Sequence, residues 1–220
     1  GLRYLETYEF GLVAKALRER EVLLRAAPHL IQPLRFVLPH APGLRPAWMI
    51  RAGLFFYDHL ARRELLPGSR GLRLSGTPLG AALRPGFTHG FEYSDGWVDD
   101  ARLVVANAQD ARARDAEVLT RCAVTAARRS AEHWDITLAG GRRVRSRALA
   151  NATGPWAERF LREQARGADD RPLGGRSLRL VKGSHIVVAQ RFAHDRAYLF
   201  QNPDGRILFA IPYQGRFTLI

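Results

Sequence analysis

The chain has 220 residues, enough for one large domain or two small ones with a sizeable core. Hydrophobic residues make up 46% and charged residues 25%, as in a soluble globular protein, and no apolar run approaches the roughly 20 residues that span a bilayer. Cys122 is the only cysteine, which excludes an internal disulfide and a cysteine-based metal cluster, so we expect a cytoplasmic protein without a metal site.

A formal net charge of +13 raises the question of a nucleic-acid or membrane partner. Lys15 and Lys182 are the only lysines among 34 basic residues, so nearly all of the positive charge is arginine scattered along the chain. This bias indicates a coding preference rather than a selected patch, and no basic run has interleaved aromatics. We therefore expect no nucleic-acid partner, whereas a basic face attracted to anionic lipid remains open.

The first half of the chain predicts two helices, one short strand and loops. Apolar residues recur at helical spacing over residues 7–27. A short strand follows at 35–38, and the proline-rich stretch 39–46 is expected to be a loop. A second helix is predicted over 47–60, and residues 67–90, rich in glycine and proline, are expected to be mostly loop.

The next part predicts a helix and a small antiparallel meander. Asp99 or Asp100 is expected to cap a helix that runs to about Arg114. Gly140 and Gly141 are expected to form a tight hairpin between the last two of four predicted strands, which are residues 117–120, 123–129, 133–138 and 142–150.

Residues 148–160 predict a buried strand, a sharp turn and a helix. The segment 148–152 is small and apolar, which suits a strand packed on both faces. Gly154 allows close approach, and Pro155 suits the first position of a helix. Such a unit directs N–H groups at an anion or a dinucleotide, but turns of this kind with a purely structural role are also common. Both interpretations remain open at this point.

The last stretch predicts an antiparallel set of strands. A strand over 178–188 is interrupted by Gly183, and three more are predicted at 197–201, 206–212 and 217–220. Together the elements indicate an α/β fold combined with α+β. No G-x-G-x-x-G follows an opening strand, and Met49 is the only methionine, so we expect the chain to be a piece of a longer protein that carries the phosphate loop elsewhere.

Four stretches carry a resemblance to a known family, and shorter matches at 45–48 and 209–212 support it. The four are residues 1–6 (Gly-Leu-Arg-Tyr-Leu-Glu), 90–103 (Gly-Phe-Glu-Tyr-Ser-Asp-Gly-Trp-Val-Asp-Asp-Ala-Arg-Leu), 151–156 (Asn-Ala-Thr-Gly-Pro-Trp) and 181–188 (Val-Lys-Gly-Ser-His-Ile-Val-Val). In this order and spacing they resemble the bacterial FAD-dependent glycerol-3-phosphate dehydrogenases. These are respiratory, aerobic flavoenzymes of the D-amino-acid-oxidase-like class.

The resemblance implies an internal fragment with portions of two domains. Segments of an FAD-binding domain are expected at residues 1–27 and 94–177. A substrate or cap segment is expected at 28–93, and an incomplete antiparallel sheet of the substrate domain at 178–220.

For the reaction, the resemblance implies that His185 takes up the hydroxyl proton of a secondary alcohol. Arg3, Tyr4 and Lys182 are implied to bind the substrate, since a guanidinium fork suits a phosphate monoester. The ordinary alternatives remain open: a core histidine for His185, surface positions for Arg3 and Lys182, and core packing for Tyr4.

The implied cofactor is FAD, and the implied contacts come mostly from small or apolar residues: Gly1, Leu2, Val124, Ala152, Thr153, Gly154 and Trp156. Val124 is implied to act through its backbone near the adenine. Asp95 and Asp99 could be taken for a carboxylate pair, but we expect a turn residue and a helix cap. Gly96 stands where members of the family often carry cysteine, which weakens any thiol role.

The resemblance implies that the parent protein oxidises sn-glycerol 3-phosphate to dihydroxyacetone phosphate, with hydride passing to FAD and electrons to a membrane quinone. It would then be peripheral on the inner face of the cell membrane, and a homodimer remains open. We expect the isolated chain to bind FAD weakly or not at all, and to be inactive. The alternatives are a related FAD-dependent amine or amino-acid oxidase and a basic, non-catalytic binding module.

Overall fold

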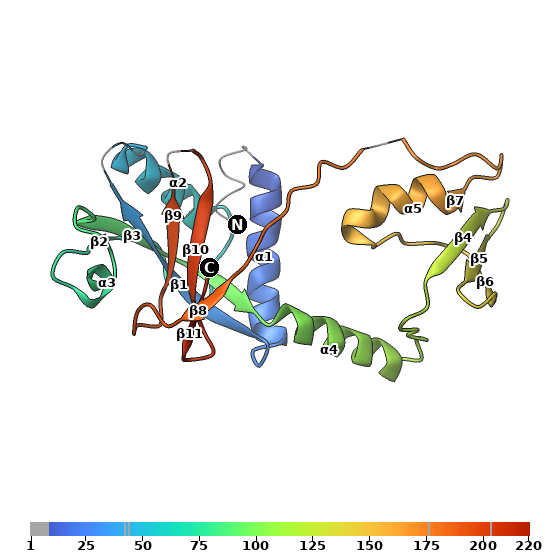
Figure 1. The fold of residues 1–220 in the computed structure, drawn as a ribbon, viewed down its shortest axis with the longest axis horizontal. Helices are drawn as coiled ribbons and strands as arrows, with labels where there is room; N and C mark the ends of the chain where they lie inside the picture. The colour runs from blue at the N-terminus through green and yellow to red at the C-terminus, as the bar shows by residue number, and fades with distance from the viewer. Residues whose placement is uncertain (1–8, 42, 44, 176, 203) are drawn as a thin grey trace. The chain divides into compact units, whose positions relative to one another are not determined.

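The computed structural model describes residues 9–41, 43, 45–175, 177–202 and 204–220. The chain forms two compact units (Figure 1). Unit 1 comprises Gly1–Asn107 and Ser184–Ile220, and unit 2 comprises Ala108–Gly183. Among the described residues, no helix is both long enough and apolar enough to cross a membrane.

A mixed sheet is the centre of unit 1. All neighbouring strands in it are antiparallel except β1 and β9, which are parallel. The strands, in spatial order, are β2 (Arg70–Arg73), β3 (His89–Val98), β1 (Ile31–His40), β9 (Ala197–Gln201), β10 (Ile207–Tyr213), β11 (Phe217–Leu219) and β8 (Val187–Ala189).

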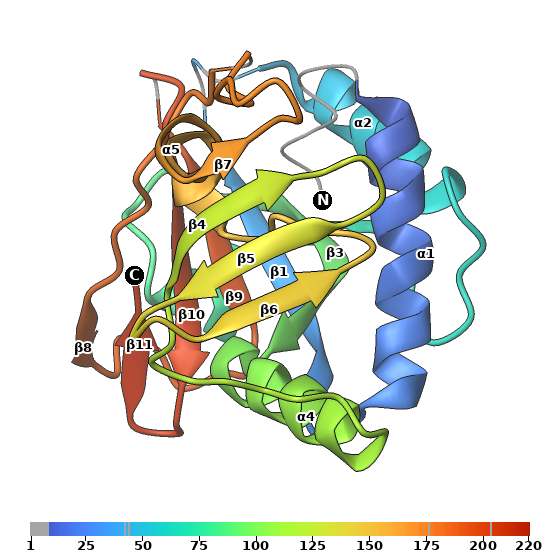
Figure 2. The same ribbon diagram turned by 90° about the vertical axis from the view of Figure 1, so that its right-hand side faces the viewer.

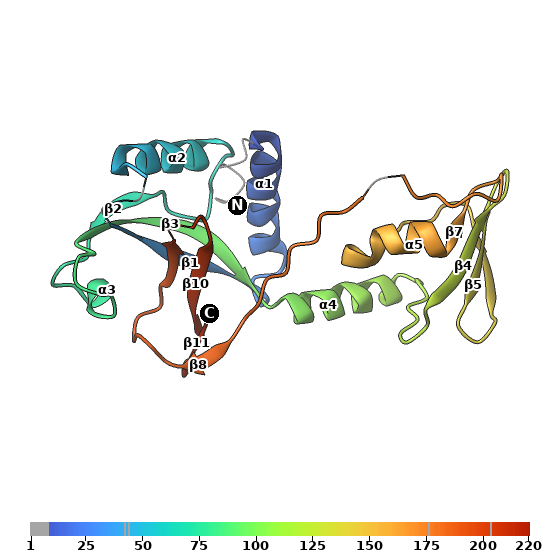
Figure 3. The same cartoon turned by 45° about the horizontal axis from the view of Figure 1, so that its top comes forward.

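Both faces of this sheet are covered. Helices α1 (Phe10–Ala26) and α2 (Ala47–His59) pack on one face, where Phe36 of β1 stacks on Tyr93 of β3 with ring centroids 5.2 Å apart. The other face buries Val37 and Tyr198 under the segment that holds α3 (Pro78–Ala81). Figure 3 shows α2 lying across the sheet beside β2 and β3. Strand alternation therefore gives unit 1 two apolar layers.

Helix α4 (Asp100–Ala113) follows β3 and crosses the boundary between the units. Asp99 caps it, because its carbonyl accepts the Leu103 N–H and its carboxylate accepts the Arg102 N–H. The start of α4 packs through Leu103 and Ala106 on a small cluster around Leu24.

Unit 2 holds a four-stranded sheet and a short helix, and its hairpin faces the viewer in Figure 2. The spatial order is β6 (Arg143–Ser146), β5 (Trp134–Leu138), β4 (Val124–Arg129) and β7 (Ala165–Arg166), with only β4 and β7 parallel. A 3₁₀ turn η2 (Gly154–Trp156) leads into α5 (Ala157–Glu163), and Phe160 of α5 packs on Ala127 and Ala165.

Several sequence predictions are confirmed. The two early helices, the helix capped by Asp99 and the strands β4 and β5 lie where the periodicity put them. Gly140 and Gly141 form the predicted hairpin with positive φ angles of 84° and 83°. The last three strands are also confirmed, with β10 antiparallel to both β9 and β11.

The prediction for the centre of unit 1 was wrong. β1 runs from Ile31 to His40 rather than over four residues, and it pairs along its whole length with β3, which the sequence did not predict. Proline and glycine indicated breaks, but Pro33 pairs with Gly96 and Pro39 with Gly90 across the two strands. Asp95 consequently lies in a strand and not in a turn.

Other predicted strands are absent from the described part of the chain. Residues 117–120 and 148–152 form no strand, and the predicted strand 178–188 shrinks to its end, where β8 begins at Val187. The small apolar residues of 148–152 are mostly exposed, and none of the described strands pairs with them. Strand propensity alone does not form a strand without a neighbour to complete its hydrogen bonds.

Candidate functional site

The turn at Gly154 is built by side-chain hydrogen bonds that start from Asn151. The Asn151 Oδ1 accepts the Thr153 hydroxyl at 2.7 Å and the Thr153 N–H at 3.3 Å, while its Nδ2 donates to the Ala157 carbonyl at 3.0 Å. The Trp156 N–H donates to the Thr153 carbonyl. These bonds fold 151–157 back on itself and fix the start of α5.

Gly154 adopts a φ of +57°, a conformation that favours glycine. A Cβ built at this position would meet no atom within 4 Å, so the space beside the backbone is open. Ala152 and Thr153 are exposed, and Trp156 is 64% exposed. The turn therefore offers open backbone and a bare indole to an incoming group.

Val124 lies at the start of β4 and is partly buried in the same small core as Leu149, which precedes the turn. The ladder between β4 and β5 shifts register between Val124 and Ala126, so the backbone is irregular at this position. Unit 2 thus holds five predicted cofactor residues on one small scaffold: Val124, Ala152, Thr153, Gly154 and Trp156.

The predicted reaction residues fall in other parts of the chain. His185 belongs to unit 1, and Lys182 belongs to unit 2; both side chains are exposed and outside regular structure. Ile186, next to His185, exchanges two backbone hydrogen bonds with Ile220, which attaches this segment to the β8–β11 edge. Gly1, Leu2, Arg3 and Tyr4 lie outside the described residues.

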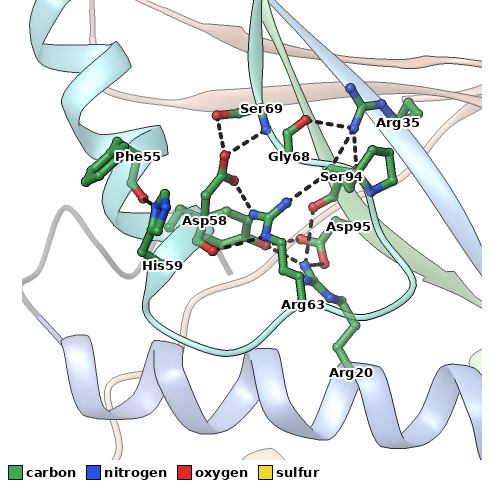
Figure 4. A network of polar contacts seen from close by, with 12 residues as sticks. Arg20, Arg35, Phe55, Asp58, His59, Arg63, Gly68, Ser69, Ser94 and Asp95 are labelled. Atoms are coloured by element: carbon green, nitrogen blue, oxygen red, sulfur yellow. Dashed lines mark hydrogen bonds and ion pairs between the residues drawn. The ribbon is translucent and has the colours of Figure 1, made fainter.

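A network of buried polar groups, which the sequence did not predict, joins α1, α2 and β3 in unit 1 (Figure 4). The Arg20 Nη1 donates to the Tyr57 hydroxyl at 3.1 Å, to the Ser94 carbonyl at 3.2 Å and to Asp95 Oδ1 at 3.3 Å. The Tyr57 hydroxyl donates to Asp95 Oδ2 at 3.1 Å. Burial and then the neighbouring Asp95 carboxylate raise the pKa of Tyr57, so it stays a neutral donor.

A second buried charge cluster centres on Glu92 of β3, which has no exposed surface. Its Oε2 accepts from Arg35 and Arg70, and its Oε1 accepts from Arg196, each at 2.7 Å. Burial alone would raise the pKa of Glu92, but the bonds from Arg35, Arg196 and Arg70 outweigh it and hold the pKa at about 2. The cluster links β1, β2 and the segment before β9 through one carboxylate.

The model of the FAD dependent oxidoreductase family matches residues 1–220, the whole chain. The chain belongs to this family. Its predicted fold class, with features of α/β and α+β folds, is confirmed, and so is the resemblance to FAD-dependent glycerol-3-phosphate dehydrogenases.

Two curated relatives with named activities are similar to the whole chain. Glycerol-3-phosphate dehydrogenase of Pseudomonas aeruginosa is 56% identical over 225 residues, which cover all of this chain and 42% of that protein. D-erythritol 1-phosphate dehydrogenase of Brucella abortus is 49% identical over 225 residues, again all of this chain and 44% of that protein. The chain therefore spans less than half the length of these relatives.

A solved structure supports the fold. The glycerol-3-phosphate dehydrogenase of Bacillus halodurans, solved in complex with FAD, matches with a TM-score of 0.60 over 92% of this chain and 36% of that one. The sequence identity is 23%, so this likeness carries the fold and nothing further.

One of the buried charges could have been recognised from the sequence, although it was not predicted. Glu92 is a lone charge between Phe91 and Tyr93, in a run whose residues are buried. An acid in such a run indicates a paired, buried carboxylate. Its arginine partners could not have been found this way, because they lie 57, 22 and 104 residues away.

Proposed function

We propose that the full-length protein is an FAD-dependent dehydrogenase that oxidises sn-glycerol 3-phosphate to dihydroxyacetone phosphate. The observation that carries the proposal is the similarity along the whole chain, at 56% identity, to a protein named glycerol-3-phosphate dehydrogenase. Because the chain spans 42% of that relative, the activity is proposed for the full-length protein rather than for these residues alone.

The Gly154 turn fits an FAD site. Its open backbone at φ +57° has nothing within 4 Å of the position that a Cβ would take, so a flat ring could approach closely. We assign cofactor contacts to Ala152, Thr153, Gly154 and Trp156, with Val124 as a backbone contact. Bound FAD supplies the hydride acceptor, which no side chain of the chain can replace.

His185 is proposed to hold the proton of the substrate hydroxyl, because neutral imidazole accepts a proton near neutral pH. Its exposed side chain is accessible to a small molecule. Lys182 is proposed to attract the phosphate, together with Arg3 and Tyr4. The proposed domain segments are those given by the sequence: residues 1–27 and 94–177 on the cofactor side, and 28–93 and 178–220 on the substrate side.

A second substrate is favoured by a specific relative. The Brucella abortus protein that is 49% identical over the whole chain is named D-erythritol 1-phosphate dehydrogenase. Both substrates are phosphate monoesters of short polyols, and erythritol is one carbon longer than glycerol. The same phosphate contacts would serve either, so the alcohol end of the pocket would decide between them.

We further propose a membrane quinone as electron acceptor, a peripheral position on the inner face of the cell membrane, and a homodimer as the assembly to test. An acceptor that resides in the bilayer requires the protein to reach the membrane surface. In an assay without membranes, a soluble artificial dye takes the place of the quinone as electron acceptor.

The test uses the purified full-length protein. Flavin content is measured by absorbance, and dye-linked oxidation is measured with glycerol 3-phosphate, erythritol 1-phosphate and a set of amino acids. We expect stoichiometric FAD and turnover of glycerol 3-phosphate. Faster turnover of erythritol 1-phosphate would favour the second substrate, whereas turnover of amino acids alone would contradict both.

A matched pair of variants tests the residue assignment. His185→Asn is expected to lower kcat about 10²-fold or more with FAD still bound, because general-base catalysis is lost. His194→Asn is the control, since the His194 side chain bonds to Tyr198 at 2.8 Å and is not assigned to the reaction. Equal activities of the two variants would remove His185 from the mechanism.

A further inference from the structure

Thr218 of β11 is a fully buried polar residue to which no role has been assigned. Its Oγ1 accepts the N–H of Arg191 at 3.0 Å, and Arg191 lies just after β8 in the chain. β8 is the outermost strand of the sheet in unit 1, and β11 is its neighbour among the described strands (Figure 2). The hydroxyl therefore links the segment that leaves β8 to the strand beside it.

The other end of β8 leads to His185, for which we propose contact with the proton of the substrate hydroxyl. The N–H of Ile186 donates to the Ile220 carbonyl at 2.8 Å, and the N–H of Ile220 donates to the Ile186 carbonyl at 2.9 Å. His185 is the residue directly before this pair and lies outside regular structure. The register in which β8 pairs with β11 therefore sets the position of His185.

Burial specifies this register only weakly. β8 has three residues, and the Ile186 and Val187 side chains are 58% and 54% exposed. Ladder hydrogen bonds join backbone groups that every residue except proline carries, so they hold two strands together without selecting a register. A slip by one residue would turn His185 to the opposite face of the sheet, and a slip by two would move it by about 7 Å.

A side-chain hydrogen bond selects a register because it requires one particular residue. Thr218 lies opposite Val188, and its hydroxyl accepts from the N–H three residues further along the chain. Among the hydrogen bonds of the described residues, this is the one that joins β11 to the segment 184–191 through a side chain. A slip would leave the buried hydroxyl without this partner, which is unfavourable.

We propose that the Thr218 hydroxyl fixes the register of β8 on β11 and thereby positions His185 for the reaction. This deepens the proposed function and rests on it for the role of His185. Thr218 is a positioning residue, because it acts through His185. A general base must lie within hydrogen-bond reach of the proton that it accepts, so a shift of a few ångströms removes its contribution.

The experiment measures dye-linked oxidation of glycerol 3-phosphate by the full-length protein with bound FAD. Thr218→Val removes the hydroxyl while nearly keeping the shape of the side chain, and it should lower kcat about tenfold or more with FAD retained. Thr218→Ser keeps the hydroxyl and should react like the wild type. Thr77→Val is the control, because it removes a hydroxyl that donates to the Leu74 carbonyl at 2.7 Å in the same unit, and it should keep the wild-type kcat.

A double variant separates positioning from a general loss of structure. Adding Thr218→Val to His185→Asn should lower kcat no further, because the base through which Thr218 acts is already absent. A double variant whose loss of activity is the product of the two single losses would overturn the proposal. The same holds for a Thr218→Val variant with wild-type kcat, and for a Thr218→Ser variant as slow as Thr218→Val.

Amide hydrogen exchange tests the register without any turnover. The N–H groups of Ile186 and Arg191 should be protected in the wild type, and they should exchange about tenfold faster in Thr218→Val but not in Thr77→Val. Unprotected amides in the wild type would overturn the proposal even if Thr218→Val did not fold. A wild type with both amides protected but without turnover of glycerol 3-phosphate would contradict the proposed function alone.

Discussion

The two units of the chain differ in whether they bury charged side chains. Unit 1 buries charge: Glu92 has no exposed surface and Arg20 is 9% exposed. No described charged residue of unit 2 is buried, and the ion-paired side chains of Glu117 and Asp135 are 60% and 49% exposed. The turn at Gly154, for which we propose the cofactor contacts, is also exposed. Buried charge therefore marks what holds unit 1 together, whereas the contacts proposed for the cofactor in unit 2 lie at an exposed turn.

The largest expected effect is on the buried carboxylate of unit 1. Glu92→Gln leaves Arg35, Arg70 and Arg196 without their shared anion, and breaking a buried ion pair costs about 3–5 kcal/mol. The urea midpoint of the full-length protein should fall accordingly. Glu117→Gln in unit 2 is the control, and its exposed pair with Arg142 should leave the midpoint unchanged. If both variants shifted the urea midpoint equally, buried and exposed carboxylates would contribute equally to stability, and the contrast between the units would be wrong.

The pH dependence of stability tests the role of the buried Glu92 carboxylate further. The pKa of Glu92 is about 2 in the folded protein and about 4.5 in the unfolded chain. A depressed folded pKa stabilises the protein above the unfolded value, and this stabilisation is lost as pH falls from about 4.5 to about 2. The midpoint difference between wild type and Glu92→Gln should be constant from neutral pH to about 5. It should then shrink in acid; a difference that grew with acidity would contradict the assigned direction.

A smaller effect is expected at the tyrosine of the network. Tyr57→Phe removes the hydroxyl that accepts from Arg20 and donates to Asp95, and a buried hydrogen bond to a charged group contributes about 1.5–3 kcal/mol. Urea unfolding measures the loss. Tyr213→Phe is the matched control, since that hydroxyl accepts only a 3.4 Å contact from Gln214 among the bonds described. The control should stay near the wild-type midpoint.

The sequence predicted the local elements better than their long-range pairing. Helical periodicity placed α1 and α2, and Gly140 and Gly141 identified their hairpin, because these signals act over a few residues. β3 was not predicted because its glycines, read locally, indicate breaks in a strand. In the structure, Gly90 and Gly96 pair with the prolines of β1 across the sheet. For residues 148–152 the error was the opposite one, because a strand was predicted and none forms. The composition suits a strand, but the described chain offers no partner strand for it.

In the candidate site, too, features set by neighbouring residues were predictable and features set by distant residues were not. The Gly154 turn was predictable, because asparagine, threonine, glycine and proline in sequence specify a turn through neighbouring atoms alone. The Glu92 cluster was not, because Arg196 reaches it from 104 residues away. Whether His185 serves the same reaction as Gly154 stays a prediction, and the variants of the full-length protein decide it.

The smallest expected effect on stability, and the one tied most directly to function, is at the turn of unit 2. Gly154→Ala forces a side chain into φ +57° and fills the open space beside the backbone. Strain of about 1–2 kcal/mol is expected to lower the stability. The added methyl group is separately expected to weaken FAD binding roughly tenfold if the turn contacts the cofactor, because it blocks close approach. Gly175→Ala is the control, because Gly175 also lies in unit 2 with nothing within 4 Å but without a positive φ.

Retained flavin after gel filtration and the Kd of re-added FAD separate the two variants. Gly175→Ala should keep its flavin, and Gly154→Ala should lose much of it while its urea midpoint moves far less than that of Glu92→Gln. If both glycine variants keep FAD equally, the turn at Gly154 is a structural feature only, and it is not part of the FAD site. If Gly154→Ala instead unfolds the protein as severely as Glu92→Gln, the turn holds the fold together, and the division of roles between the units fails.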